Sequence, residues 1–278
     1  MKYDLAQLVR RTKNPRRKVV VLRPIVPPKA LASDLYTSTY KRIIEALNAA
    51  IPGIVAAYER ALPVRDGFAD AADDVQPELE SLGDWLRRLV LSLTPALGEW
   101  TVRVERWHRQ RWRRAVLTAT GVDIETMLLA TGQPTSMAET VAWNVALLKD
   151  VSAQAQSRIG NAVFAAFQQR KPAADLAREL RDIVDMSRRR SLGIAADQLQ
   201  KLSGALDTER MADAGFDRWK YHHSDKLHPR LWHKAREGKI YDLRTNKEID
   251  GPDQIKPGDG PTEPPFCGCK KQGVLVLN

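Results

Sequence analysis

Apolar residues recur at helical spacing through most of the chain, from Ser33 to about Gly215. A repeat every three or four positions places apolar side chains on one face of a helix, so this region predicts a series of amphipathic helices. The clearest stripes lie at Tyr36, Tyr40, Ile43, Ile44, Leu47, Ile51, Val55, Tyr58 and Leu62, at Leu79, Leu82, Trp85, Leu86, Leu89 and Leu93, and at Trp100, Val104 and Trp107.

Breaks in this pattern predict where helices end. The segments TGQPTS and RKPAAD are typical of short connections between helices, and ALPVRDGFADAADD is typical of a longer acidic connection. Ser136 and Glu139 have the spacing of a capping box, so we expect a helix to begin there.

After Gly215 helical periodicity stops, and aromatic residues, histidines, glycines and prolines become frequent. The segments DRWKYHHS, GKIYDL and GVLVLN are strand candidates separated by turn residues. The expected fold is therefore α+β, with a mostly α-helical body and a small, loop-rich C-terminal subdomain that contains strands. Its expected parts are a basic N-terminal arm (1–32), a helical body (33–215) and the C-terminal subdomain (216–278).

Charge is the feature of the composition that changes this picture. The 278 residues include 44 Lys and Arg against 34 Asp and Glu, a net charge of +10, while 43% hydrophobic residues argue against a disordered chain. A basic protein attracts nucleic acid, membrane surfaces or acidic protein surfaces. The densest basic segment is the N-terminal arm, which we expect to contact an acidic partner or DNA through Arg10, Arg11, Lys13, Arg16, Arg17, Lys18 and Arg23.

Two basic segments have alternative interpretations. Within the arm, Val19 to Leu22 could add an edge strand to a partner or dock on its own chain. The segment VRVERWHRQRWRR interleaves arginines with Trp107 and Trp112, as nucleic-acid surfaces do. A solvated helix whose tryptophans face the core explains the same pattern, and we favour it.

The sequence shows no sign of membrane insertion. No stretch approaches the roughly 18 apolar residues of a membrane helix, and the first residues lack the apolar region of a signal peptide. We therefore expect a soluble protein made in the cytoplasm.

The C-terminal segment carries the candidate chemistry. His222, His223, His228, His233, Cys267 and Cys269 offer enough nitrogen and sulfur for a tetrahedral zinc site, and a metal would help to hold together so small a subdomain. From these we single out His228, His233, Cys267 and Cys269. The C-x-C spacing is tighter than the usual zinc pair, so hydrogen-bonded histidines and reduced thiols are the alternative.

Sequence motifs of common enzymes are absent: the chain contains no G-x-S-x-G, no P-loop and no Gly-rich dinucleotide turn. A metal-dependent nuclease that uses His228, His233 and the cysteines is the enzymatic alternative.

The order of features in the last third of the chain resembles the phage Mu F-protein-like head morphogenesis family. The residues that fit its pattern are Ala214, Gly215, Trp219, His233, Gly238, Tyr241, Pro264, Pro265, Cys267 and Cys269, and His228 and Pro229 lie near the place where members often have R-x-x-P. Gly268 stands where many members have arginine, and Phe266 stands where they have histidine or asparagine.

The resemblance implies a non-enzymatic minor capsid protein that lies near the portal and acts in procapsid assembly and in packaging or delivery of the genome. Its implied partners are the portal protein, the major capsid protein, the scaffold and the packaged DNA. Its implied location is the virion, and the host cytoplasm during assembly.

Overall fold

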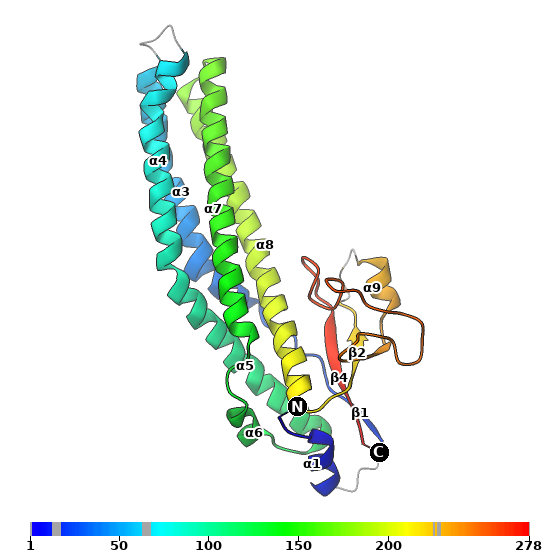
Figure 1. The fold of residues 1–278 in the computed structure, drawn as a ribbon. Coiled ribbons are helices and arrows are strands. Elements are labelled where there is room, and N and C mark those ends of the chain that lie inside the picture. Colours follow the sequence, from blue (N-terminus) through cyan, green and yellow to red (C-terminus); the bar gives the residue numbers. More distant parts are fainter. Residues whose placement is uncertain (1, 13–17, 63–67, 225, 227–228, 278) are drawn as a thin grey trace. The chain divides into compact units, whose positions relative to one another are not determined.

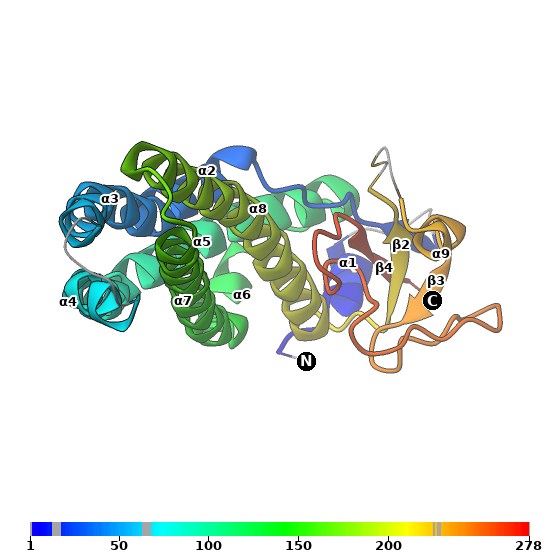
Figure 2. The same cartoon turned by 90° about the horizontal axis from the view of Figure 1, so that it is seen from above.

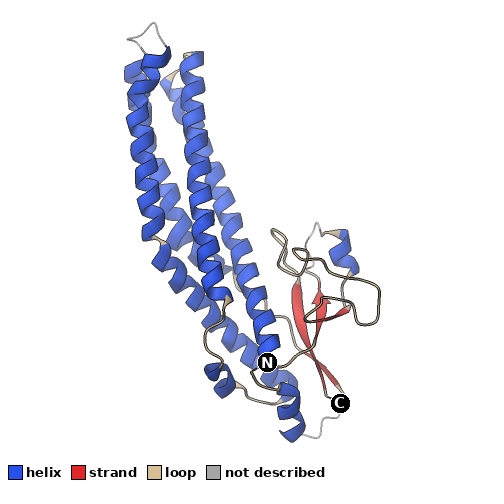
Figure 3. Ribbon diagram, in the orientation of Figure 1, coloured by secondary structure: helices blue, strands red, loops and turns tan. Residues whose placement is uncertain are grey.

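The computed structural model describes residues 2–12, 18–62, 68–224, 226 and 229–277. Helices make up most of these residues, and a four-stranded antiparallel sheet forms from segments near both termini (Figure 3). This arrangement confirms the α+β fold expected from the sequence.

The chain forms two compact units. The helical unit contains residues 32–100 and 141–195, and the sheet unit contains residues 1–31, 101–140 and 196–278. This division differs from the three consecutive segments expected, because residues 101–140 and 196–215 of the expected helical body belong to the sheet unit.

The helical unit is a bundle in which long helices lie side by side (Figures 1 and 2). Its elements are α2 (Lys29–Leu35), a π-helical turn (Tyr36–Tyr40), α3 (Lys41–Ala61), α4 (Phe68–Ser92) and parts of α5 (Thr94–Thr120), α7 (Ser136–Gln169) and α8 (Ala173–Asp213). Most of the first apolar stripe is buried, and the largest buried side chains of α3 and the turn before it include Tyr40, Leu47, Ile54 and Tyr58, whereas Trp85 of the second stripe is 50% exposed. The Tyr58 hydroxyl donates to the carbonyl oxygen of Lys171 at 2.6 Å, which satisfies a polar group inside the bundle.

Two local expectations are corrected. The acidic connection expected before α4 is shorter, because α4 already begins at Phe68; residues 63–67 lie outside the described part. Helix α7 begins at Ser136 as expected, but without the expected capping box. The Ser136 amide donates to Oε1 of Glu209 at 2.8 Å, and the Ser136 hydroxyl has no hydrogen-bond partner among the described residues.

The sheet has the strand order β1-β4-β2-β3. Its strands are β1 (Val19–Val21), β2 (Arg218–His222), β3 (Ile240–Asp242) and β4 (Lys270–Val276), and every neighbouring pair is antiparallel. The short helices of this unit are α1 (Leu5–Thr12), α6 (Glu125–Ala130) and α9 (Leu231–Ala235). The three strands near the C-terminus confirm the three strand candidates.

Aromatic side chains fill the core beside β2. Trp219 is fully buried, stands opposite Tyr241 on β3 and Gly273 on β4, and stacks on the Tyr241 ring at 4.9 Å between centroids. Position 273 requires glycine because a Cβ atom there would lie 2.8 Å from the Phe216 ring. Strand β4 therefore packs closely against the aromatic cluster formed by Phe216, Trp219 and Tyr241.

The N-terminal arm docks on its own chain. Leu5, Ala6 and Val9 of α1 are buried, and β1 pairs with β4, with Val19 opposite Val276. Of the two interpretations of the Val19–Leu22 segment, the structure shows the strand docked on its own sheet.

The described helices include none that is both long and apolar enough to cross a membrane.

Candidate metal centre

Three of the predicted ligands converge in the sheet unit. His233 lies on α9, whereas Cys267 and Cys269 lie in the loop that leads into β4. All three side chains are buried, and their ligand atoms lie within 4.8 Å of one another. Sequence periodicity predicts no clear helix after the histidines, but the structure places His233 on this short one.

Turn geometry brings the cysteines to the histidine. The amide of Cys267 donates to the carbonyl oxygen of Pro264 at 3.1 Å, closing a turn in which Phe266 has a positive φ of 58°. The amide of Phe266 donates to Oδ1 of Asp197 on α8 at 2.5 Å. These bonds anchor the loop, and the Phe266 side chain is 58% exposed.

His233 is oriented through both ring nitrogens. Its Nδ1 atom lies 3.6 Å from the sulfur of Cys267 and 3.6 Å from the sulfur of Cys269. Its Nε2 atom lies 3.0 Å from Oδ1 of Asp259, an acceptor for an Nε2 proton. That tautomer leaves the Nδ1 lone pair directed at the two sulfurs, as a metal-binding histidine requires.

Asp259 is itself held as an anion. Burial alone would raise the pKa of its carboxyl group, but hydrogen bonds from Arg236, Trp232 and His233 outweigh burial and lower this pKa to about 2. Nη1 of Arg236 donates to Oδ2 of Asp259 at 2.6 Å, and Nε1 of Trp232 donates to Oδ1 at 3.0 Å. A fixed carboxylate therefore stands behind the imidazole.

The two thiols influence each other. The hydrogen bond between the sulfurs raises the pKa of Cys267, helped by burial, and lowers the pKa of Cys269 against the effect of burial. The Tyr221 ring packs against His233 at 5.9 Å between centroids, and burial raises the pKa of the Tyr221 hydroxyl. The two sulfurs therefore form a close donor pair, and the thiolate is the form of cysteine that binds a metal ion.

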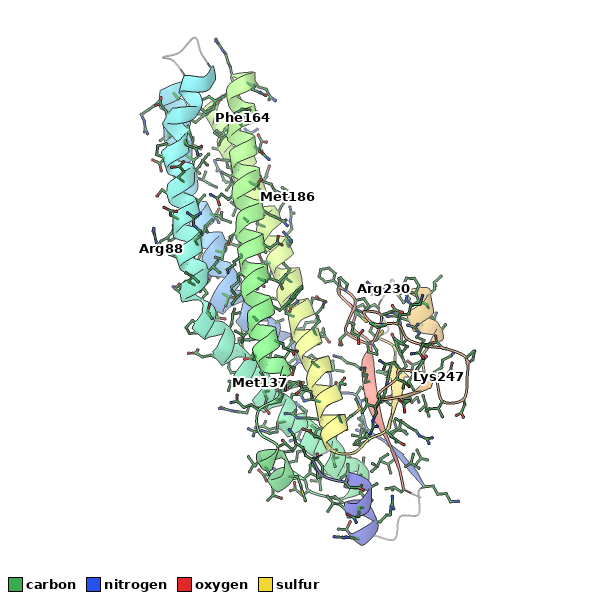
Figure 4. The ribbon with its side chains drawn as sticks, in the orientation of Figure 1. Arg88, Met137, Phe164, Met186, Arg230 and Lys247 are labelled. Atoms are coloured by element: carbon green, nitrogen blue, oxygen red, sulfur yellow. The ribbon has the colours of Figure 1, made fainter. Side chains whose placement is uncertain are left out.

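A cavity of about 390 Å³ opens beside these three side chains. The residues that line it are His223, Ser224, Lys226, Pro229, Arg230, His233, Pro265, Phe266, Cys267, Gly268 and Cys269. Lys226 donates to the carbonyl oxygen of Phe266 and Arg230 to that of Pro265, so both cations hold the cysteine loop. Figure 4 labels Arg230 just before α9.

The remaining histidine candidates differ in their surroundings. His228 lies outside the described residues. His222 is partly exposed, and its Nδ1 atom lies 3.5 Å from Oε1 of Glu237. His223 is buried and lines the cavity.

The remaining residues of the resemblance also belong to the sheet unit. Gly215 has a φ of 77° directly after α8, and Gly238 has a φ of 81° before β3, so both occupy turns that favour glycine. Trp219 and Tyr241 form the stacked pair on β2 and β3, and Pro264 and Pro265 precede the cysteines.

Residues proposed for polyanion contact lie in and after α1. Lys13, Arg16 and Arg17 fall outside the described residues, whereas Arg10, Arg11, Lys18 and Arg23 are exposed. Of these, Arg23 lines a groove of about 400 Å³ whose other cationic residues, Arg111 and Arg114, come from α5.

The structure separates the roles within the arginine-rich segment of α5. Trp112 is buried and packs against Phe216 at 5.9 Å between centroids, which fits the core interpretation. Trp107 is half-buried and lines the groove, where the guanidinium carbon of Arg111 lies 5.9 Å from its ring centroid. Trp107 also packs against the buried core, as the favoured interpretation expects, so it contributes to both the core and the groove.

Other arginines of α5 form ion pairs with nearby carboxylates. Arg109 pairs with Glu105 at 3.7 Å, and Arg113 pairs with Asp123 at 2.5 Å. Among the described residues, Arg23, Arg111 and Arg114 form no ion pair. Three cationic side chains without an ion-pair partner among the described residues therefore line the groove.

Sequence reasoning missed the residues that support the centre. Asp259 lies 26 residues from His233 and 23 residues from Arg236 along the chain, so local sequence patterns do not connect them. The PGDG sequence around Asp259 is a turn signal, but it does not identify the residue as a partner of His233. It also missed a buried polar cluster in which Nε2 of His108 lies 2.9 Å from Oδ1 of Asp207. Arg210 bonds to both His108 and Glu105 there.

Comparison with known proteins gives little guidance. No family model and no solved structure matches the chain. A protein of Haemophilus influenzae, described as uncharacterized, is 27% identical over 124 residues, which cover 44% of this chain. The aligned part is 28% of the relative, so the chain spans well under two thirds of that protein's length.

Proposed function

We propose that this chain is a minor protein of a phage head that acts near the portal during procapsid assembly. One observation supports the proposal: motif residues up to 55 positions apart, from Ala214 to Cys269, belong to a single folded unit. Within it, Trp219 and Tyr241 belong to the buried core, and His233 lies beside both cysteines. Residues that pack together in one small domain must keep their order and spacing along the chain, which gives a physical reason for the order of the motif.

The chain would act through protein surfaces, with the portal protein and the major capsid protein as partners and the scaffold during assembly. The test starts from a phage that encodes the chain. The gene for the chain is deleted from the phage genome, and in a second experiment it is supplied to the host on a plasmid. Deletion is expected to lower particle yield or infectivity, and the plasmid is expected to restore it. Normal yield and normal infectivity without the gene would overturn the proposal.

Zinc is the metal that best fits the three ligands. Zn–S bonds of about 2.3 Å and a Zn–N bond of about 2.0 Å, at a tetrahedral angle, separate nitrogen from sulfur by about 3.5 Å. The Nδ1 atom of His233 lies 3.6 Å from each sulfur. Thiolate with imidazole is also the donor mixture that zinc prefers, and Asp259 supplies the carboxylate that commonly supports a ligand histidine.

A zinc ion there would tie α9 to the loop before β4 and so stabilise the sheet unit. Elemental analysis of the purified chain is expected to find one zinc per chain, and the double variant Cys267→Ser/Cys269→Ser is expected to have none. A strong chelator should lower the unfolding temperature of the native chain and leave that of the variant unchanged. A metal-free native chain with no response to added zinc would exclude the site.

Nucleic-acid binding is the second candidate function, and the groove formed by Arg23, Trp107, Arg111 and Arg114 favours it. Its three cations lack ion-pair partners among the described residues, and an aromatic ring lies beside them, so phosphates and a base find complementary groups. This function is compatible with a head protein that touches packaged DNA. Binding that falls steeply with salt would support it.

A further inference from the structure

The described centre supplies three ligands, whereas structural zinc sites are closed by four. We infer that His223 supplies the fourth, which makes the centre a Cys₂His₂ site. The inference rests on the zinc site proposed above.

Strand register places His223 beside the cysteines. On β2 and β4, Tyr221 pairs with Lys271 and His222 pairs with Lys270. One further step in this register sets His223 directly opposite Cys269. Residues directly opposite each other in an antiparallel pair share one face of the sheet, with Cβ atoms roughly 4.5–5.5 Å apart.

Gly268 supports the extended register. The next step sets Ser224 opposite Gly268, and a Cβ atom built on Gly268 would lie 3.0 Å from the Cβ atom of Ser224. The two segments therefore stay side by side beyond the last paired residues of β2 and β4.

Continuing the alternation of β2 by one residue places His223 on the face of the sheet that carries Trp219 and Tyr221. Trp219 and Tyr221 are buried on one face, and Tyr221 packs against His233. His222 points the other way and pairs with Glu237, whereas His223 follows Tyr221 by two positions and is 6% exposed. It lines the same cavity as both cysteines and His233.

The imidazole of His223 must turn to reach the ion, because the described ligand atoms that lie within 4.8 Å of one another are those of His233, Cys267 and Cys269. His223 lines the cavity of about 390 Å³, and a rotation about its two side-chain bonds would exchange its present contact for one with the ion. Two thiolates and two neutral imidazoles also balance the +2 charge of zinc, which matters in a buried site.

The experiment compares histidine variants of the full chain. Zinc affinity is measured by competition with a chromogenic chelator, and cobalt absorption spectra report the number of thiolate and nitrogen ligands. His223→Ala is expected to weaken zinc binding about 100-fold or more, beyond the 10–100-fold typical of a supporting residue. His222→Ala, one position away and on the other face, is expected to bind zinc like the native chain.

His223→Cys controls for misfolding. It offers a new ligand at the same position, so it is expected to retain tight binding and to intensify the thiolate bands of the cobalt spectrum, whereas His222→Cys should change neither. Native affinity in His223→Ala would overturn the assignment, and a loss confined to His228→Ala would assign the position to His228 instead. Native protein that binds no zinc at all would overturn the zinc proposal itself, a result distinct from either of these.

Discussion

The Nε2 atom of His233 lies 3.0 Å from Oδ1 of Asp259, while Nδ1 of the same ring faces the sulfurs of Cys267 and Cys269. This carboxylate-to-imidazole contact sets the tautomer of the histidine. The centre is therefore supported by a residue that the sequence motif does not include.

Replacing Asp259 tests that support. Asp259→Asn keeps a side chain of the same shape but removes the charge that holds the ring, so zinc affinity is expected to fall 10–100-fold. Chelator competition measures it, with Asp250→Asn, an exposed aspartate nearby, as the control. Equal affinity in both variants would show that Asp259 does not support the site.

The groove predicts a salt-dependent interaction. The triple variant Arg23→Gln/Arg111→Gln/Arg114→Gln is expected to bind single-stranded DNA more weakly than the native chain. The slope of log affinity against log salt is expected to fall by about 1 for each phosphate that the variant no longer neutralises. Fluorescence anisotropy at several salt concentrations measures both quantities.

A control of equal charge uses exposed arginines of the helical unit: Arg60→Gln/Arg88→Gln/Arg189→Gln. Figure 4 shows Arg88 on α4. If this control weakens binding as much as the groove variant, net charge and not the groove explains the affinity. Tight binding of an acidic peptide, with no binding of DNA, would instead assign the groove to a protein partner.

Substitutions in the aromatic cluster of Trp219 and Tyr241 are expected to destabilise the sheet unit more than substitutions at its surface. Trp219 is fully buried against Tyr241, so Trp219→Ala is expected to lower the free energy of unfolding by about 3–5 kcal/mol. Trp85→Ala removes a half-exposed ring from α4 and should cost far less. Urea unfolding followed by circular dichroism compares them, and similar costs would contradict the assigned core.

Buried His108 predicts a loss of stability in mild acid. Burial lowers the pKa of its imidazole below the usual 6.5, against the opposing effect of Asp207. Between the two values the unfolded chain binds a proton that the folded chain does not, so stability falls as the pH drops below about 6.5.

Thermal unfolding between pH 7.5 and 5.5, with chelator present to exclude metal release, measures this dependence. His108→Gln is expected to flatten it, and His222→Gln, a partly exposed histidine, is the matched control. An unchanged slope in His108→Gln would mean that other groups cause the acid sensitivity.

The sequence predicted the helices and strands better than it predicted which of them pack together in one unit. Periodicity located the helices and alternation located β2, β3 and β4, because each pattern records which side chains face a core. It did not show that residues 101–140 pack with the sheet unit, since an apolar stripe does not identify the surface that covers it. Likewise, Val19–Leu22 could be read as a strand, but only the paired register with β4 identified its partner.

The candidate centre was also predicted in part. Donor chemistry singled out His233, Cys267 and Cys269, which do converge. His223 could not be ranked above its neighbours, because its place depends on register with a strand about 46 residues away, and Asp259 was missed because carboxylates are common in loops.

The central claim is that the chain is a component of phage heads near the portal. Asymmetric cryo-electron microscopy of purified heads, from phage that encode the native chain and from phage in which it is deleted, tests this claim most directly. Density for a few copies is expected at the portal vertex of native heads and is expected to be lost in the deletion. Identical maps, together with the absence of the chain from purified heads by mass spectrometry, would contradict it.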